Sequence, residues 1–352
     1  MITESLDLTR SPLDGPGLSD RTTVDRRLVH RAALSEVFVT DSAQVGDATY
    51  EVGAQLPPQH AYYGDHTGRV ARVDPLLLLE CCRQAETLVA HAYLGVPLGQ
   101  HFVLRSWDMA FPGIGDIPVG YAPPTLRLLV EVEQPRTVHG VLRSLTYRVT
   151  LLVQQPVGES EVGRVSTEVM FASPMAYRAL RDTRRRTTLV TSAGLRDAPV
   201  PPPVDPALVA RAHERNVVLT TVEADEQEVR GVLRLPFTNA SLFDHAQDHV
   251  PAMVLTEAAR QLALVALADT HGLSAQHTHV GAIAGRFLQY VELDEPTVLH
   301  LETPRAPVRL TPDHPPRSTA AVRVVQGDRP AATIELALDT LPGPLAVRRA
   351  SA

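Results

Sequence analysis

The sequence predicts an α+β protein made of two copies of one unit, in which an antiparallel sheet wraps around a buried helix. The first observation is a repeat: PLLLLECCRQAE at 75–86 and AMVLTEAARQLAL at 252–264 carry Glu, Arg and Gln at matching positions, 177 residues apart. The second is that strand-like stretches rich in β-branched residues flank both segments in the same order. The third is that the second segment is apolar nearly all round, which favours neighbours on most sides of its helix.

The first unit is expected at residues 28–176, after a polar, Gly- and Pro-containing stretch that predicts a flexible arm at 1–27. Pro75 suits the first turn of a helix and Gly95 suits its end. In order along the chain, the unit should contain two short strands at 34–57, a long loop at 57–75 and the helix at 75–95. A three-stranded meander should follow at 125–173.

The second unit is expected at residues 207–342 and repeats this order, with a loop at 238–251 and a helix from about 253 to 270. Between the units, residues 177–206 combine an arginine run with a proline run, which is the composition of a linker. The arginine run is interpreted as a solvated connector and not as a binding patch. Residues 343–352 are expected to form a C-terminal tail.

Composition excludes several classes of function. The chain has 352 residues, is 44% hydrophobic and carries a formal net charge of −7, and its basic residues are not interleaved with aromatic ones, so no nucleic-acid partner is expected. No signal peptide or membrane-spanning run is evident, which predicts a cytoplasmic protein without a membrane partner. No metal or cofactor motif is visible, and the adjacent Cys81 and Cys82 suit small core positions.

The repeated polar residues are the strongest functional signal. A Glu-x-x-Arg pair is ordinarily a helical ion pair of small value, but repetition and apolar surroundings favour a role in function. Burial should disfavour the charged form of Glu257 while Arg260 favours it, and such opposed influences tune carboxylates for proton transfer.

Three stretches together resemble the A-factor biosynthesis family of γ-butyrolactone synthases, which are built from two hotdog repeats: EVGAQLPPQHAYYG, DPLLLLECCRQAETLVAHAYLGVPLGQHF and DHAQDHVPAMVLTEAARQ. The resemblance implies a tandem, or double, hotdog fold. It also implies an acyltransferase that moves a β-ketoacyl group from acyl carrier protein to a hydroxyl of dihydroxyacetone phosphate. The phosphorylated ester would cyclise toward a butenolide, a precursor of γ-butyrolactone signals that control secondary metabolism.

The resemblance also implies where the site lies, because hotdog pairs place a helix of one half against a loop of the other. We expect Glu257 to act as a base, with Arg260 orienting it or holding the acceptor phosphate, and Glu80 and Arg83 to form a matching or shared site. The expected substrate-binding residues are Gln84, Gln261, His66, His245, His249 and Ala252.

Some of these positions have a simpler interpretation. The loop histidines, which include His60, also suit capping or turn roles. Ala252 stands where the family usually has glycine, which matters only if the site needs a left-handed residue. Trp107 and Asp108 would line an acyl tunnel, or Trp107 is plain core.

Two other classes of function remain open at this level. A hotdog helix with a histidine loop and a glutamate also fits a thioesterase or dehydratase acting on acyl thioesters, although Arg260 favours a phosphorylated acceptor. A non-catalytic acyl- or lactone-binding protein would use the polar residues as a structural clasp. Two hotdogs in one chain form the usual pair internally, so both a monomer and a homodimer are compatible with the sequence.

Overall fold

The computed structural model describes residues 18–183, 185, 189–225, 227–309 and 315–341. Residues 1–17 of the predicted arm and the whole predicted tail at 343–352 therefore lie outside the described residues. The chain forms two compact units. Unit 1 contains residues 1–59, 76–104 and 111–184, and unit 2 contains residues 60–75, 105–110 and 185–352. Two short segments of the first half thus belong to the second unit.

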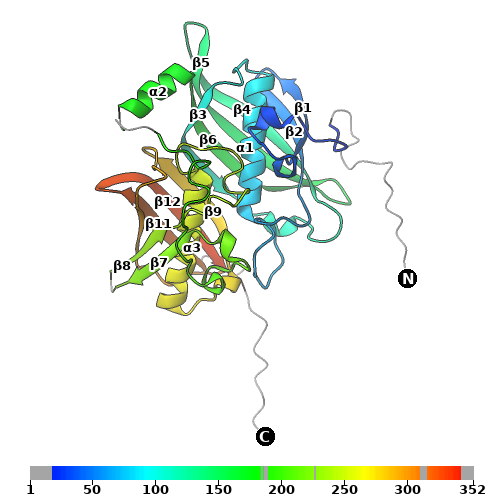
Figure 1. The fold of residues 1–352 in the computed structure, drawn as a ribbon. Coiled ribbons are helices and arrows are strands. Elements are labelled where there is room, and N and C mark those ends of the chain that lie inside the picture. The colour runs from blue at the N-terminus through cyan, green and yellow to red at the C-terminus, as the bar shows by residue number, and fades with distance from the viewer. Residues whose placement is uncertain (1–17, 184, 186–188, 226, 310–314, 342–352) are drawn as a thin grey trace. The chain divides into compact units, whose positions relative to one another are not determined.

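Unit 1 is an antiparallel sheet with a central helix, α1 (Pro75–Ala92), on one face (Figure 1). Its strands pair in the order β1-β2-β4-β5-β6. They are β1 (Val39–Gly46), β2 (Thr49–Gln55), β4 (Thr125–Val138), β5 (Val141–Gln154) and β6 (Glu159–Ala172). Buried and more exposed residues alternate along β5 and β6, as expected for strands with one covered face.

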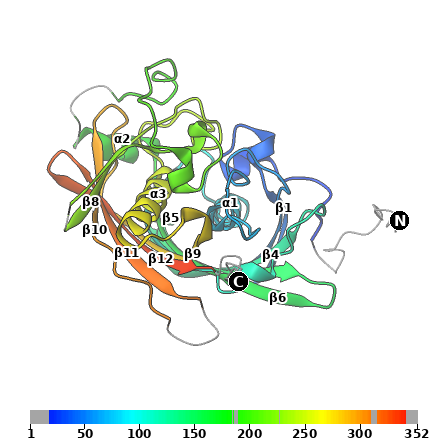
Figure 2. The ribbon, with the colours of Figure 1, turned by 90° about the horizontal axis from the view of Figure 1, so that it is seen from below.

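Unit 2 repeats this plan around α3 (Ala252–His271), which contacts every strand from β7 to β12. The strands pair antiparallel in the order β9-β12-β11-β10-β8-β7. They are β7 (Leu219–Ala224), β8 (Glu228–Leu233), β9 (Thr278–Phe287), β10 (Thr297–Glu302), β11 (Arg317–Gln326) and β12 (Arg329–Thr340). Seen from below, α3 lies against the face of this sheet (Figure 2). The predicted wrapping of an all-round apolar helix by sheet is confirmed.

Both central helices form where the sequence predicts them. Pro75 occupies the first position of α1, where its missing N–H costs nothing, and Gly95 beyond the helix end has a φ of +66°. Gly272 caps α3 with a φ of 63°, and its N–H donates to the carbonyl of Ala268. The side chains of Cys81 and Cys82 are buried thiols in α1.

Two elements were not predicted. Strand β3 (His101–Ala110) ends in unit 2, where residues 106–110 pair with β9. Helix α2 (Pro174–Asp182) begins after Ser173, whose hydroxyl accepts the N–H of Ala176, and it covers the first residues of the expected linker. Short 3-10 helices complete the fold: η1 (Arg26–Val29), η2 (Leu34–Glu36), η3 (Ile114–Asp116), η4 (Pro206–Val209), η5 (Glu214–Asn216) and η6 (Ala275–His277).

Candidate functional site

The glutamines of the two central helices tie each helix to the chain that leads into the first strand of its unit. The carboxamide of Gln84 accepts the N–H of Phe38 at 2.9 Å and donates to the carbonyl of Glu36 at 2.7 Å. Gln261 makes the same two bonds with the backbone groups 180 residues further along. Both also donate to the glutamate four residues earlier. Their predicted role in substrate binding stays a prediction.

Each helix glutamate is bound by two arginines, and one arginine of each pair was missed in the sequence. Glu80 is contacted by Arg83 on its own helix and by Arg31, which lies just after η1. Glu257 is contacted by Arg260 and by Arg211, which follows η4. The two additional arginines are 180 residues apart.

A sequence signal for these arginines existed. The segments DRRLVHRA at 25–32 and DPALVARA at 205–212 share Asp, Leu, Val, Arg and Ala at matching positions. In both, the aspartate caps a 3-10 helix and the residue before the arginine adopts the left-handed conformation, His30 with φ 53° and Ala210 with φ 52°. This conformation is uncommon for residues other than glycine, and it directs the following arginine to the glutamate.

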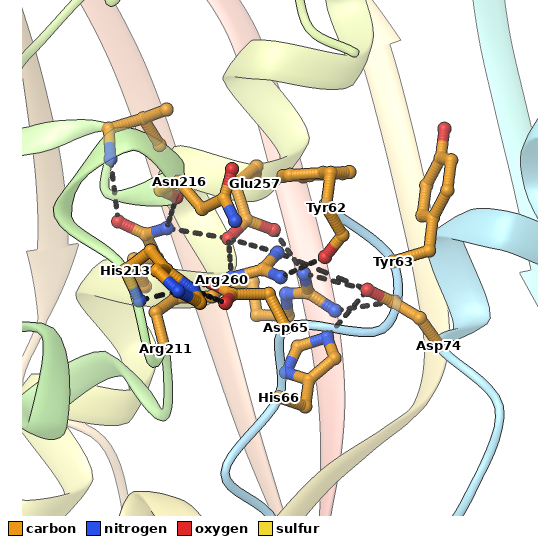
Figure 3. A network of polar contacts seen from close by, with 12 residues as sticks. Tyr62, Tyr63, Asp65, His66, Asp74, Arg211, His213, Asn216, Glu257 and Arg260 are labelled. Carbon is orange, nitrogen blue, oxygen red and sulfur yellow. Dashed lines mark hydrogen bonds and ion pairs between the residues drawn. The ribbon is translucent and has the colours of Figure 1, made fainter. Parts of the chain in front are cut away.

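The cluster around Glu257 is the more elaborate of the two (Figure 3). Arg211 donates through Nη2 to Oε1 of Glu257 at 2.8 Å, and Arg260 contacts Oε2. Arg260 also donates through Nη1 to Oδ1 of Asp74 at 2.7 Å. Both carboxylates and Arg211 have side chains with no exposed surface, and the side chain of Arg260 is 4% exposed. Two carboxylates and two guanidiniums therefore neutralise one another inside unit 2.

His66 lies at the edge of this cluster. Its Nε2 is 2.5 Å from Oδ2 of Asp74, and 26% of its side chain is exposed. Its backbone bridges to that of Arg211, so the loop before α1 is held against the segment after η4. The predicted partnership between the second helix and the loop of the first repeat is thus present within unit 2, with His66 as the loop histidine that reaches the cluster.

Burial and ion pairing act in opposite directions on the acids of the cluster. Burial alone would raise the pKa of Glu257, but Arg211 and Arg260 outweigh it, and the net pKa lies below the usual value. Burial also opposes ionisation of Asp74, yet Arg260 and His66 hold its pKa well below the ordinary range. Burial and the positive charge of Arg211 lower the pKa of His66. The cluster near neutral pH therefore contains two carboxylates and a neutral imidazole.

The remaining loop histidines make other contacts. Nδ1 of His60 accepts the N–H groups of Tyr62 and Tyr63, a local turn role. His249 pairs with Asp248 at 2.6 Å, and His245 lies beside Gln247. In the described part of the chain, none of them bonds to Glu257, whose side-chain partners are Arg211, Arg260 and Gln261. Their predicted roles in binding stay predictions.

Tyr62 completes the buried surroundings of Arg211. The guanidinium carbon lies 4.5 Å from the centre of the Tyr62 ring, and Nη1 donates to the Tyr62 carbonyl at 2.7 Å. Ala252 opens α3 with an ordinary negative φ, so no left-handed residue is needed there. Trp107 is 3% exposed and meets the ring of Phe287 edge-on at 5.0 Å, which places it in the core.

The cluster around Glu80 differs from the cluster around Glu257 in two ways: in the described ranges it has neither a second carboxylate nor a histidine. Glu80 is bound by Arg31, Arg83 and Gln84, and although burial opposes ionisation, the arginines lower its pKa to about 2. Arg83 donates to Glu80 and to the carbonyl of Val29, whereas its counterpart Arg260 bonds to a second carboxylate. Among the described residues, this cluster holds no histidine. The predicted action of Glu80 and Arg83 in a site stays a prediction.

Within the described ranges, no group of three or more His, Cys, Asp and Glu side chains is arranged to hold a metal ion. None of the described helices has both the length and the apolar character needed to cross a membrane.

Comparison with known proteins agrees with this duplicated architecture. The A-factor biosynthesis hotdog domain matches residues 16–167 and again residues 193–342. A 2-oxo-3-(phosphooxy)propyl 3-oxoalkanoate synthase of Streptomyces virginiae is 34% identical over 80% of this chain and 87% of its own length. A synthase of the same name from Streptomyces coelicolor is 31% identical over 78% of this chain and 80% of its own length. With both repeats matched, the chain belongs to the A-factor biosynthesis hotdog domain family.

Proposed function

We propose that this protein is a 2-oxo-3-(phosphooxy)propyl 3-oxoalkanoate synthase, the activity for which its relatives are named. In this reaction a β-ketoacyl group leaves the thioester of an acyl carrier protein and is joined to a hydroxyl of dihydroxyacetone phosphate. The phosphorylated ester then cyclises by intramolecular condensation toward a butenolide. The observation that carries this proposal is the match to the synthases over most of the chain, with both repeats included.

We place the chemistry at the cluster of unit 2, with His66 as the proton acceptor. Asp74 is ionised and lies against Nε2 of His66, so this nitrogen carries the proton and Nδ1 presents its lone pair. The acceptor hydroxyl oxygen would attack the thioester carbonyl carbon while its proton passes to Nδ1. The carbon–sulfur bond then breaks, and the thiolate leaves with a proton returned by the imidazolium.

In this proposal the main role of Glu257 is to position Arg211 and Arg260. Both of its oxygens accept hydrogen bonds, and its pKa is lowered, so it is a weaker base than the sequence suggests. It fixes Arg211 and Arg260, and Arg260 in turn fixes Asp74 behind His66. The prediction that Glu257 is itself the base is tested by the same experiment.

Backbone groups at the start of α3 suit the oxyanion that forms on the thioester carbonyl. The N–H groups of Val254 and Leu255 already donate to the carbonyl of Pro251. Those of Ala252 and Met253 have no acceptor within the described ranges and lie at the positive end of the helix dipole. Neither contact depends on a particular side chain.

The experiment is mass spectrometry of the purified protein with a β-ketoacyl carrier thioester and dihydroxyacetone phosphate. We expect wild-type protein to form the phosphorylated ester or its butenolide, and His66→Gln to lower the rate by about 100- to 10,000-fold, the range for loss of a general base. Glu257→Ala and Arg260→Ala should also lose the product. If His66→Gln keeps the wild-type rate while Glu257→Gln is inactive, the base is Glu257.

His300→Gln is the matched control. Nδ1 of His300 lies 3.0 Å from Oε1 of Glu228, and its side chain is 23% exposed, so it is a similar histidine–carboxylate pair on β10, outside the cluster. It should keep full activity. Formation of β-keto acid or dehydrated thioester by the wild type, equally well without the triose phosphate, would instead identify a thioesterase or dehydratase.

A further inference from the structure

Two basic side chains of unit 2, those of Arg72 and His279, have no carboxylate partner within the described ranges. Arg72 precedes Asp74 in the loop before α1, and its guanidinium makes no hydrogen bond or ion pair within the described ranges. His279 lies near the start of β9, opposite Asp339 of β12. Its Nε2 is buried and has no partner among the described residues. In unit 2, an arginine and an imidazole nitrogen thus have no hydrogen-bond partner among the described residues.

The charge of Arg72 and the charges of the cluster both act on His279. Burial, followed by the positive charge of Arg72, lowers the pKa of His279 to about 4, and Asp74, His66 and Arg260 also act on it. His279 is therefore a neutral imidazole near pH 7, and it has a nitrogen available for a hydrogen bond. A buried nitrogen without a partner is costly, so a polar ligand there would relieve an existing deficit.

The backbone keeps the loop of Arg72 against the start of β9. The N–H of Thr67 donates to the carbonyl of Ala210, and the N–H of Arg69 donates to the carbonyl of Gln276, each at 3.0 Å. Nε2 of His277, the next residue after Gln276, is also buried without a partner among the described residues. The border of the cluster is thus rich in nitrogen donors on both of the segments that form it.

Two carboxylates of this region, those of Asp74 and Asp339, are already bound. Asp74 accepts from Arg260 and lies against His66. Asp339, the register partner of His279, accepts two hydrogen bonds from Arg317 at 2.7 and 2.9 Å. The positive charge of Arg72 is therefore available to an anion from outside the protein. A phosphate monoester supplies only acceptor oxygens and negative charge, which match an arginine and an imidazole N–H.

We propose that Arg72 and His279 form the subsite that binds the phosphate of the triose phosphate acceptor. The inference rests on the proposed function and makes it more specific. With the phosphate held by these two residues, the hydroxyl end of the acceptor would be directed to the cluster that contains His66. Arg260 is then released from the phosphate-binding role suggested by the sequence, since its two terminal nitrogens are occupied by Asp74 and Glu257.

The test compares two acceptors in Arg72→Gln and His279→Gln. With dihydroxyacetone phosphate, we expect kcat/KM of Arg72→Gln to fall about 10- to 100-fold, the value of one charge-assisted hydrogen bond, and that of His279→Gln to fall by a smaller factor. With unphosphorylated dihydroxyacetone, both variants should match the wild type. Equal losses with the two acceptors, or an unchanged preference for the phosphorylated one, would overturn the subsite.

Arg329→Gln is the control, because Arg329 is an exposed arginine ten residues before Asp339 on β12, about 33 Å along the strand from His279. Titration calorimetry with inorganic phosphate provides a second measurement without acyl transfer. Weaker phosphate binding by Arg72→Gln than by wild type and Arg329→Gln supports the subsite, and equal binding overturns it. If the wild type forms no ester, the proposed function fails while this binding comparison still decides the subsite.

Discussion

Three buried glutamates on the two central helices have pKa values shifted in opposite directions, because only two of them form ion pairs with arginines in the described part of the chain. Arginines lower the pKa of Glu80 to about 2 and that of Glu257 below its usual value, despite burial. Burial raises the pKa of Glu86 to about 8, and a hydrogen bond with Thr167 offsets only part of this effect. The phenol of Tyr147 lies nearby and is itself buried. Glu86 is thus a neutral acid inside unit 1 near pH 7.

Glu86→Gln should stabilise the protein at neutral pH. The folded state keeps the proton of Glu86 up to about pH 8, whereas the unfolded state releases it near pH 4.5, so wild-type stability falls as pH rises between these values. The cost at pH 7 is on the order of 3 kcal/mol. Urea unfolding at several pH values should show a decline of about 1 kcal/mol per pH unit from this residue, absent in Glu86→Gln. Parallel curves for both proteins would contradict the assignment.

The pH dependence of activity should identify the proton acceptor. His66 must be neutral to accept a proton, and burial with the charge of Arg211 lowers its pKa below 6.5. Hence kcat/KM should be constant around pH 7 and fall only as pH drops through that lowered pKa. The residual activity of His66→Gln should lack this acid limb. An acid limb that is retained in His66→Gln would assign the titration to another group.

At the scale of elements, one glutamine holds each central helix to the entry of its sheet. Gln261→Met keeps the volume of the side chain but leaves the N–H of Val218 and the carbonyl of Asn216 buried without partners. We expect unfolding free energy to fall by about 2–4 kcal/mol, because two buried backbone groups lose their hydrogen bonds. Gln44→Met, at an exposed position on β1, should change it by less than about 0.5 kcal/mol. Chemical denaturation measures the unfolding free energy of both variants. Similar losses at the two positions would show that the backbone hydrogen bonds of Gln261 contribute little to stability.

Elements with strong periodicity were predictable, and those with weak local signals were not. The two central helices and most strands follow from hydrophobic patterns and from Pro75 and Gly95. Strand β3 lacks a clear alternation, since its first half is only partly buried. Helix α2 has nine residues, and its start signal at Ser173 was obscured by the arginine and proline runs that follow it.

Only the part of the site that lies on one helix was predictable from the sequence. Glu257, Arg260 and Gln261 form one buried group because they lie at i, i+3 and i+4 of a helix. Asp74 is 186 residues from Arg260, and Arg211 is 46 residues from Glu257. Only the folded chain brings such distant residues together. A repeat search extended to short 3-10 segments would have found Arg31 and Arg211, but no local pattern pairs Asp74 with Arg260.

At the scale of the whole molecule, the second half of the chain should not make a working site alone. A fragment from residue 193 to the end lacks Asp74, so Arg211 and Arg260 would share Glu257 as their only buried carboxylate in the cluster. Loss of one partner of a buried ion pair costs about 3–5 kcal/mol. The fragment should melt at a lower temperature than the full chain, by circular dichroism, and form no ester.

Asp74→Asn in the full chain is the companion variant, since it removes the same charge and leaves every element present. It should also lose ester formation and should show a lowered melting temperature. Ester formation by the fragment at the rate of the full chain would mean that Asp74 and His66 are dispensable.

The loop of residues 60–75 is encoded in the first repeat but belongs to the compact unit of the second. This division has a consequence for inheritance. Recombination between the repeats would separate Asp74 and His66 from Arg260 and Glu257, and a second half from a different ancestor would arrive without matched partners. Either half of the duplicated gene can acquire substitutions, but one half can no longer be exchanged without the other. A substitution at position 74 should therefore be accompanied by a matching substitution at position 260.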